Sequence, residues 1–101
     1  PYYPPGDLPD ICLGQDEYHT SNKLIELSCH YLEAQGYTVA INHPFKGSLV
    51  PLTYYQKNKR VQSIMLEVSR KLYCDENNRK IPGYNRLKKT LQNLLQILEK
   101  V

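Results

Sequence analysis

Short apolar runs alternate along this chain with two longer stretches of helical periodicity, and this alternation limits the possible folds more than any other feature. Residues 10–14, 37–42 and 60–69 have the pattern of buried strands, because they are apolar and bounded by polar residues or Gly. Residues 21–35 and 84–100 repeat apolar side chains at spacings of three, four and seven, as amphipathic helices do. The order strand, helix, strand, loop, strand, helix predicts an α/β fold with mainly parallel pairing.

The sequence also indicates where the helices begin and end. Thr20 or Ser21 can cap the first helix, and Gly36 supplies the left-handed residue that ends it. Pro51 favours one or two helical turns directly after it. One apolar stripe runs along the second helix, and we expect it to face the core: Leu87, Leu91, Leu94, Leu95 and Leu98.

Length and composition indicate one domain that covers residues 1–101. No apolar run approaches the ~20 residues of a membrane span, and no signal peptide is visible, so no membrane partner is expected. Three widely spaced cysteines, Cys12, Cys29 and Cys74, fit neither a disulfide framework nor a zinc knuckle, which favours a cytoplasmic protein. The chain lacks an initiator Met and its three strands would make a thin sheet, so we expect it to be part of a longer protein.

A carboxylate interrupts the strongest strand pattern. Glu67 lies among Ile64, Met65, Leu66 and Val68, and burial of an unpaired carboxylate costs several kcal/mol. One interpretation is a salt bridge with Arg60 or Arg70. The other is a general acid or base near the carboxyl end of a strand, where open α/β sheets bind ligands.

The segment NHPFKG, residues 42–47, follows the preceding strand and supports the second interpretation. Asn42 carries an amide that donates and accepts hydrogen bonds, and Gly47 lets the backbone approach a ligand closely. If strands 37–42 and 60–69 are parallel, Asn42 and Glu67 end at the same edge of the sheet. If they are antiparallel, the hypothesis of a shared site weakens.

The segments DICLG, TVAINHPFKGSLVP and IMLEVSRKLYCDE, in this order, resemble the C-terminal half of the N-formylglutamate amidohydrolase family. The first family motif, N-x-P-F-x-G, matches at residues 42–47, and the second, E-hydrophobic-N-R-x-L-Y, matches at 67–73 with Ser69 in place of the usual Asn. The resemblance implies a zinc carboxypeptidase-like fold, with a sheet flanked by helices and one catalytic zinc. It also implies that this chain is the C-terminal part of a larger amidohydrolase domain.

The resemblance further implies roles for individual residues. Glu67 would be the general base for hydrolysis of an N-formyl or N-acyl amino acid, a small-molecule amide. Asn42, Phe45 and Gly47 would belong to the substrate loop, and Arg70 would help to orient the site, although strand alternation places it on the opposite face from Glu67.

The expected zinc ligands, a His and Glu pair and a further His, would come from upstream sequence. His19, His30 and His43 show no HExxH spacing. The chain alone therefore has no predicted metal ligand, and whether it is an enzyme by itself stays open.

Two alternatives remain beside the hydrolase. A non-catalytic or truncated module could bind a partner or pack on an upstream half of the protein. Nucleic-acid binding is disfavoured, because a net charge of +3 is mild and the basic residues form no dense stripe. These basic residues are Lys57, Lys59, Arg60, Arg86, Lys88 and Lys89.

Overall fold

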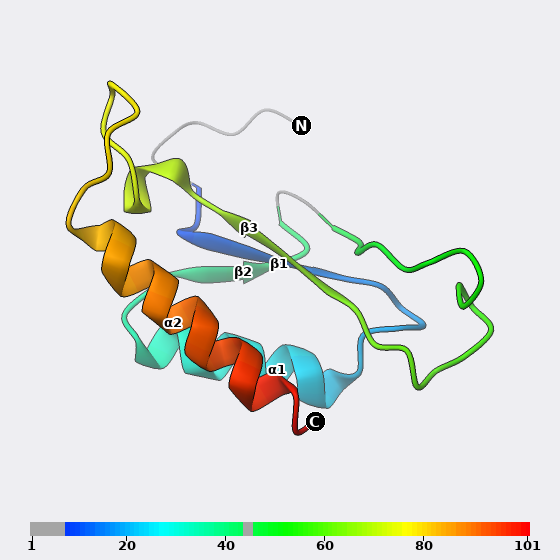
Figure 1. Cartoon of the computed structure of the whole chain (residues 1–101). Coiled ribbons are helices and arrows are strands. Elements are labelled where there is room, and N and C mark those ends of the chain that lie inside the picture. The colour runs from blue at the N-terminus through cyan, green and yellow to red at the C-terminus, as the bar shows by residue number, and fades with distance from the viewer. Residues whose placement is uncertain (1–7, 44–45) are drawn as a thin grey trace.

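The computed structural model describes residues 8–43 and 46–101, which form a three-stranded sheet with two α-helices (Figure 1). The elements in chain order are β1 (Ile11–Gln15), α1 (Asn22–Ala34), β2 (Val39–Ile41), β3 (Ile64–Val68), the short 3₁₀ helix η2 (Arg70–Leu72) and α2 (Gly83–Leu98). The strand order is β2-β1-β3, with β1 parallel to β2 and antiparallel to β3. The predicted α/β class is confirmed, whereas the expected mainly parallel pairing is wrong for β3.

The connection between β2 and β3 explains why β3 runs backwards. Parallel strands need a crossover, usually a helix, that returns the chain to the opposite edge of the sheet. Among the described residues of the segment 42–63 there is no helix that could do so. The segment instead stays at the end of the sheet where β1 and β2 finish, and β3 starts there, with Ile64 paired to Gln15.

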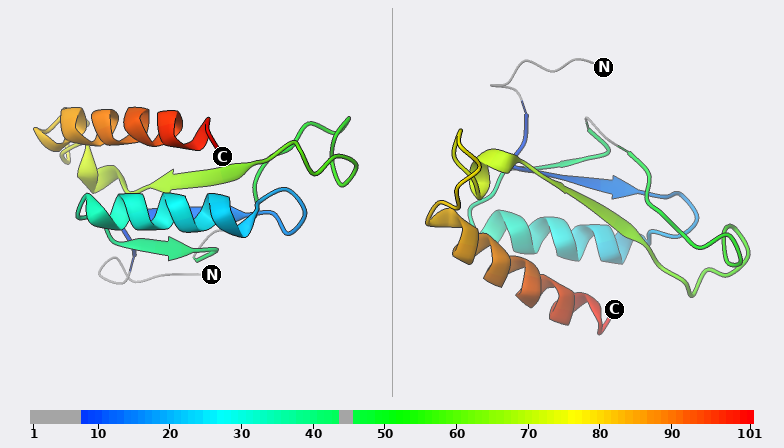
Figure 2. Two further views of the ribbon diagram at one scale, coloured as in Figure 1. Left: turned by 90° about the horizontal axis from the view of Figure 1, so that it is seen from below. Right: turned by 45° about the horizontal axis from the view of Figure 1, so that its top comes forward.

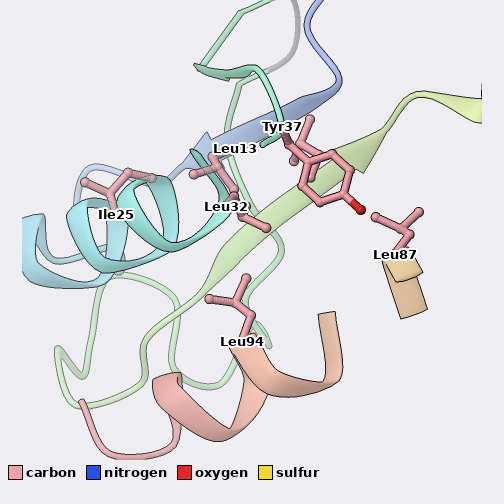
Figure 3. Close-up of a cluster of buried hydrophobic side chains, with 7 residues drawn as sticks. Leu13, Ile25, Leu32, Tyr37, Leu87 and Leu94 are labelled. Carbon is pink, nitrogen blue, oxygen red and sulfur yellow. The ribbon is translucent and has the colours of Figure 1, made fainter. Parts of the chain in front are cut away.

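The hydrophobic core lies on one face of the sheet, which we call the helix face. Leu13 of β1 and its antiparallel partner Leu66 of β3 both contribute to this core. Leu32 of α1 and Leu94 of α2 are 0% and 2% exposed, and Figure 3 shows side chains from both helices directed toward Leu13. The two views in Figure 2 place α1 and α2 on the same side of the sheet.

Because side chains alternate along a strand, the other face of the sheet carries a different set of residues. We call it the second face. It carries Cys12 and Gly14 of β1, which pair with Glu67 and Met65 of β3.

Local signals set both ends of α1 as predicted. The Ser21 hydroxyl accepts a hydrogen bond from the Leu24 N–H at 3.1 Å, as an N-cap does. At the other end Gly36 has φ +94°, and its N–H donates to Glu33 O at 2.9 Å. The Tyr37 N–H donates to Leu32 O at 3.2 Å, which completes a Schellman motif.

Substitution Ser21→Ala is expected to lower the free energy of unfolding by about 1 kcal/mol, because it leaves the first turn of α1 without its cap. The same hydroxyl donates to Gln62 Oε1 at 2.7 Å, so the substitution also removes a tie to the segment before β3. Urea unfolding followed by circular dichroism measures the change. The variant Ser21→Asp keeps the capping acceptor and should recover most of the loss, and a loss of equal size in both variants would contradict the capping role.

Helix α2 matches the predicted helix, and its leucine stripe faces the core with one exception. Leu87 and Leu94 are buried, and Leu91 and Leu98 pack against the core. Leu95 is 63% exposed, because it lies about 100° around the helix from Leu94. Neither described helix combines the length and hydropathy that a membrane-spanning helix needs.

One expected element is absent and another is shorter than predicted. The residues after Pro51 form successive hydrogen-bonded turns, for example from Tyr54 N–H to Pro51 O at 2.9 Å, and not a helix. The third strand begins at Ile64 because the preceding residues bind the loop between β1 and α1. The Ser63 N–H donates to His19 O at 3.0 Å, and the Thr20 hydroxyl donates to Ser63 O at 2.5 Å.

Candidate functional site

The carboxyl ends of the parallel strands β1 and β2 meet at one edge of the sheet, and the predicted site residue Asn42 lies there. Its N–H donates to Leu13 O at 2.8 Å, which extends the parallel ladder by one residue beyond β2. Asn42 has φ +56°, and its side-chain Oδ1 accepts from the Gln15 N–H at 2.8 Å. Its Nδ2 lies 3.4 Å from Gln15 Oε1. Asn42 therefore turns the chain away from β2 and fixes the end of β1.

The predicted loop residue Gly47 crosses the second face of the sheet above Gly14. A Cβ added to Gly14 would collide with the Gly47 carbonyl oxygen and would lie 2.6 Å from Met65 Cε. Gly47 itself has φ +88°, a conformation that other residues adopt at a cost, although its own Cβ position is open. Sequence reasoning did not single out Gly14, yet this glycine permits the close approach of the loop.

Glu67 lies on the second face and is exposed, so the expectation that it is buried is wrong. Its sequence neighbours Leu66 and Val68 pack against the core, whereas Glu67 alternates to the opposite side. The part of the chain that the structure describes contains one ion pair, Lys71 with Asp10 at 3.8 Å. In that part Glu67 therefore forms no salt bridge with an arginine.

The antiparallel direction of β3 separates Glu67 from the edge that holds Asn42. Cys12 of β1 pairs with Glu67 of β3 on one side and with Ala40 of β2 on the other. Asn42 follows two residues after Ala40. Standard strand spacings put the Cα atoms of Glu67 and Asn42 roughly 12 Å apart. β3 is antiparallel to β1 and β2, so Asn42 and Glu67 do not end at the same edge and the hypothesis of a site shared by these two residues is weakened. Glu67 still shares the second face with Gly47.

The remaining predicted site residues are not drawn into this edge. Arg70 is the first residue of η2, is exposed, and lies beyond the end of β3 that adjoins the start of β1. It lines a different hollow, with Lys71, Cys74, Asp75 and Glu76. Phe45 lies outside the described residues.

A hollow of about 530 Å³ opens at the carboxyl edge, and we call it the edge hollow. Its lining comprises residues 15–18, Asn42, Lys46, Gly47, Tyr55 and Gln56. Lys46 contributes a positive charge, and Asp16 and Glu17 contribute negative charges. Sequence reasoning placed Asn42 and Gly47 at this site but missed Tyr55 and Gln56, because nothing in their local pattern indicates that they return to the end of β1.

The described residues do not form a metal centre, since no three His, Cys, Asp or Glu side chains among residues 8–43 and 46–101 could hold an ion together. His19 is 1% exposed, and both of its ring nitrogens are occupied by backbone partners, so it has no atom to offer to a metal. His30 is exposed on α1. A zinc ion therefore does not fit the side chains described here.

Cys29 does not provide a nucleophile. Burial raises the pKa of the Cys29 thiol, and a hydrogen bond to Glu33 together with the charge of that carboxylate raises it further. A thiol with a raised pKa stays protonated at neutral pH, and the protonated form is a poor nucleophile.

The two basic clusters do not make one surface. Lys59 lies over the Tyr18 ring, 5.3 Å from its centroid, in the loop before β3. Arg86, near the start of α2, lies over the Tyr37 ring at 5.0 Å from its centroid and donates a hydrogen bond to Gln35 O. Figure 1 shows these segments at opposite ends of the molecule, so they form no continuous basic stripe of the kind that follows a nucleic-acid backbone.

Comparison with known proteins agrees with the motifs at residues 42–47 and 67–73. The structure is similar to the crystal structure of N-formylglutamate amidohydrolase from Ralstonia eutropha JMP134, with a TM-score of 0.77 and 33% sequence identity. The match covers 98% of this chain and 36% of that one, so the chain spans about a third of the length of this solved relative. No curated protein matches the chain. Residues 1–74 match the sequence model of the N-formylglutamate amidohydrolase family, and the chain belongs to this family.

Proposed function

We propose that this chain carries the general base and the substrate loop of an amidohydrolase that acts on N-formyl or N-acyl amino acids. The observation that carries the proposal is the position of the loop: Gly47 crosses above Gly14 on the face of the sheet that also presents Glu67. The family membership supports the reaction class, which is hydrolysis of a C–N amide bond. The reaction centre would lie over the second face, between Glu67 and the edge hollow.

Glu67 would act on the water that attacks the amide. The carboxylate accepts a proton from this water as its oxygen bonds to the carbonyl carbon, and it returns the proton to the amine nitrogen as the C–N bond breaks. Glu67 is exposed and forms no ion pair among the described residues, so its carboxylate oxygens are accessible to a water molecule. A tightly paired carboxylate would be a poorer base, because the partner cation lowers its proton affinity.

The loop and the edge hollow would hold the amino-acid part of the substrate. Lys46 supplies a positive charge for a carboxylate, and the second N–H of the Asn42 amide is a donor for an acyl or carboxylate oxygen. Ser48 Oγ, next to Gly47, is buried with no hydrogen-bond partner among the described residues, so this hydroxyl can bond to a polar group of a ligand. The contributions of Phe45 and Arg70 stay predictions.

The zinc ion that the family resemblance implies is part of the proposal, but its ligands are not. We assign them to sequence upstream of residue 1, because the described side chains do not fit a metal centre. When bound, zinc would polarise the amide carbonyl and increase the acidity of water. The proposed protein is cytoplasmic, and its proposed partners are a small amide substrate and the upstream part of the same protein.

A non-catalytic module that packs on another half of the protein is the second candidate. The loop before β3 exposes large apolar side chains, with Leu49 and Leu52 94% and 86% exposed. Apolar surface of this kind is typical of a contact with a further protein segment. This candidate predicts association without turnover.

The test is the release of formate and free amino acid from N-formyl-L-glutamate by the full-length protein, compared with N-acetyl-L-glutamate and N-formyl-L-leucine. We expect hydrolysis of at least one of these amides, loss of the activity after dialysis against a chelator, and its return with added zinc. Absence of turnover from the zinc-loaded protein on all three substrates would favour the non-catalytic candidate. Turnover that survives the chelator would contradict the zinc part of the proposal alone.

A further inference from the structure

A histidine that the proposed reaction does not use lies at the centre of the loops around the edge hollow. His19 is 1% exposed, and its Nδ1 lies 2.7 Å from Val61 O. Its Nε2 lies 2.8 Å from the Gln56 backbone nitrogen, which donates a hydrogen bond to it. Because a carbonyl oxygen only accepts and an amide N–H only donates, the ring must carry its proton on Nδ1 and be neutral.

The segment that His19 holds forms one side of the edge hollow, and we call it the 55–56 wall. Gln56 has φ +55°, which costs a residue with a side chain about 1 kcal/mol and needs compensation from the surroundings. The Tyr55 ring lies 6.0 Å from the imidazole, centroid to centroid. Asn42 and Gly47 line the same hollow, so a shift of the wall changes the space that is shared with these residues.

We propose that His19 is a positioning residue: in its neutral form it holds the 55–56 wall against the edge hollow and thereby sets the affinity for substrate. The inference rests on the proposed function, because it takes the edge hollow as the binding site of the amino-acid part of the substrate. It adds a residue far from the reacting atoms, which acts only through the backbone N–H of Gln56.

Contacts on the other sides of the ring hold His19 in this position. The Tyr18 ring lies 4.7 Å from the imidazole, centroid to centroid, and the Asp16 carboxylate accepts from the His19 backbone N–H at 2.9 Å. The side chain that holds the 55–56 wall is therefore itself fixed by its neighbours.

Two substitutions separate the two ring nitrogens. In His19→Asn the amide nitrogen lies near the position of Nδ1 and keeps the donor to Val61, but the acceptor for Gln56 is lost. In His19→Gln the amide oxygen reaches the position of Nε2 and keeps that acceptor. We expect KM for the best substrate to rise about five- to tenfold in His19→Asn, as loss of one hydrogen bond allows, and to stay within about threefold in His19→Gln.

The kinetic pattern distinguishes positioning from a general loss of stability. The rise in KM should appear in His19→Asn and not in His19→Gln. Values of kcat, corrected for the folded fraction, should change little in either variant. Equal KM values in both variants would overturn the inference.

A measurement without substrate keeps the inference separate from the proposed function. Hydrogen exchange of the Gln56 amide in the full-length protein should be protected in the wild type and in His19→Gln, and about tenfold less protected in His19→Asn. If the protein hydrolyses none of the amides, the proposed function fails and this exchange pattern still decides whether His19 holds the wall.

Discussion

Substitution of Glu67 by Gln is expected to lower kcat of the full-length protein by about 100- to 10,000-fold, which is the usual contribution of a general acid or base. Glutamine keeps the shape and polarity of the side chain but cannot carry the proton from the attacking water to the amine. Since Glu67 is exposed and forms no ion pair among the described residues, its substitution should leave the free energy of unfolding within about 0.5 kcal/mol of wild type. Formate release at saturating substrate measures the first quantity and urea unfolding the second.

A matched control for this substitution is Glu26→Gln on α1. Glu26 is also exposed, and it lies on the helix side of the sheet, away from the second face. We expect full activity in this variant. Turnover by Glu67→Gln at the rate of Glu26→Gln would remove Glu67 from the mechanism, whereas a loss of activity that only follows a loss of folded protein would indicate a structural role.

Substitution Gly14→Ala is expected to displace the loop that contains Gly47, which is the proposed substrate loop. The added methyl group meets the Gly47 carbonyl oxygen, which belongs to the backbone and cannot rotate away as a flexible side chain does. Overpacking of this kind costs about 1–3 kcal/mol of unfolding free energy. The loop must move away from the sheet to make room for the methyl group. This movement should remove at least one well-aligned polar contact to substrate, so KM should also rise by about tenfold or more.

The control for Gly14→Ala is Gly36→Ala, which separates destabilisation from displacement of the loop. Gly36 ends α1 with φ +94°, so alanine there costs about 1–2 kcal/mol through backbone strain. It lies at the far end of β2 from Asn42, and its substitution should leave KM unchanged. If both variants raise KM by the same factor, the close approach of Gly47 to Gly14 has no specific part in binding.

The helices were predictable from sequence because local interactions set them. The N-cap at Ser21 and the left-handed Gly36 act within one turn of α1, and the leucine spacing of α2 needs only one apolar partner surface. Leu95 is the exception. It is adjacent to Leu94 in the sequence, and the pattern alone does not indicate which of these two side chains is exposed to solvent.

The direction of β3 and the exposure of Glu67 could not be predicted in the same way. The usual rule for parallel strands assumes a helical crossover, and residues 42–63 take an irregular route instead. Apolar residues on both sides of Glu67 in the sequence suggested burial, but the two described helices cover only one face of the sheet. The period of two along a strand indicates which side chains share a face of the sheet. It does not indicate whether other elements cover that face.

The candidate site was predictable in part, for a related reason. Asn42 and Gly47 carry a signal in their own motif, and both line the edge hollow. His19 and Gln56 are 37 positions apart, and neither has a pattern that points to the other. Contacts of this kind depend on where a long loop folds back, and that is a property of the tertiary structure.

The split between the two faces of the sheet has a consequence for how such a protein can diverge. Stability resides in the leucines and isoleucines that meet the helices, whereas in the proposed function recognition would reside in the loop of residues 46–56 on the other side. Mutations in this loop would then change which amide is accepted while the scaffold stays intact. Selection for a new substrate would leave its mark in this loop first, with Gly14 retained because the loop crosses above it.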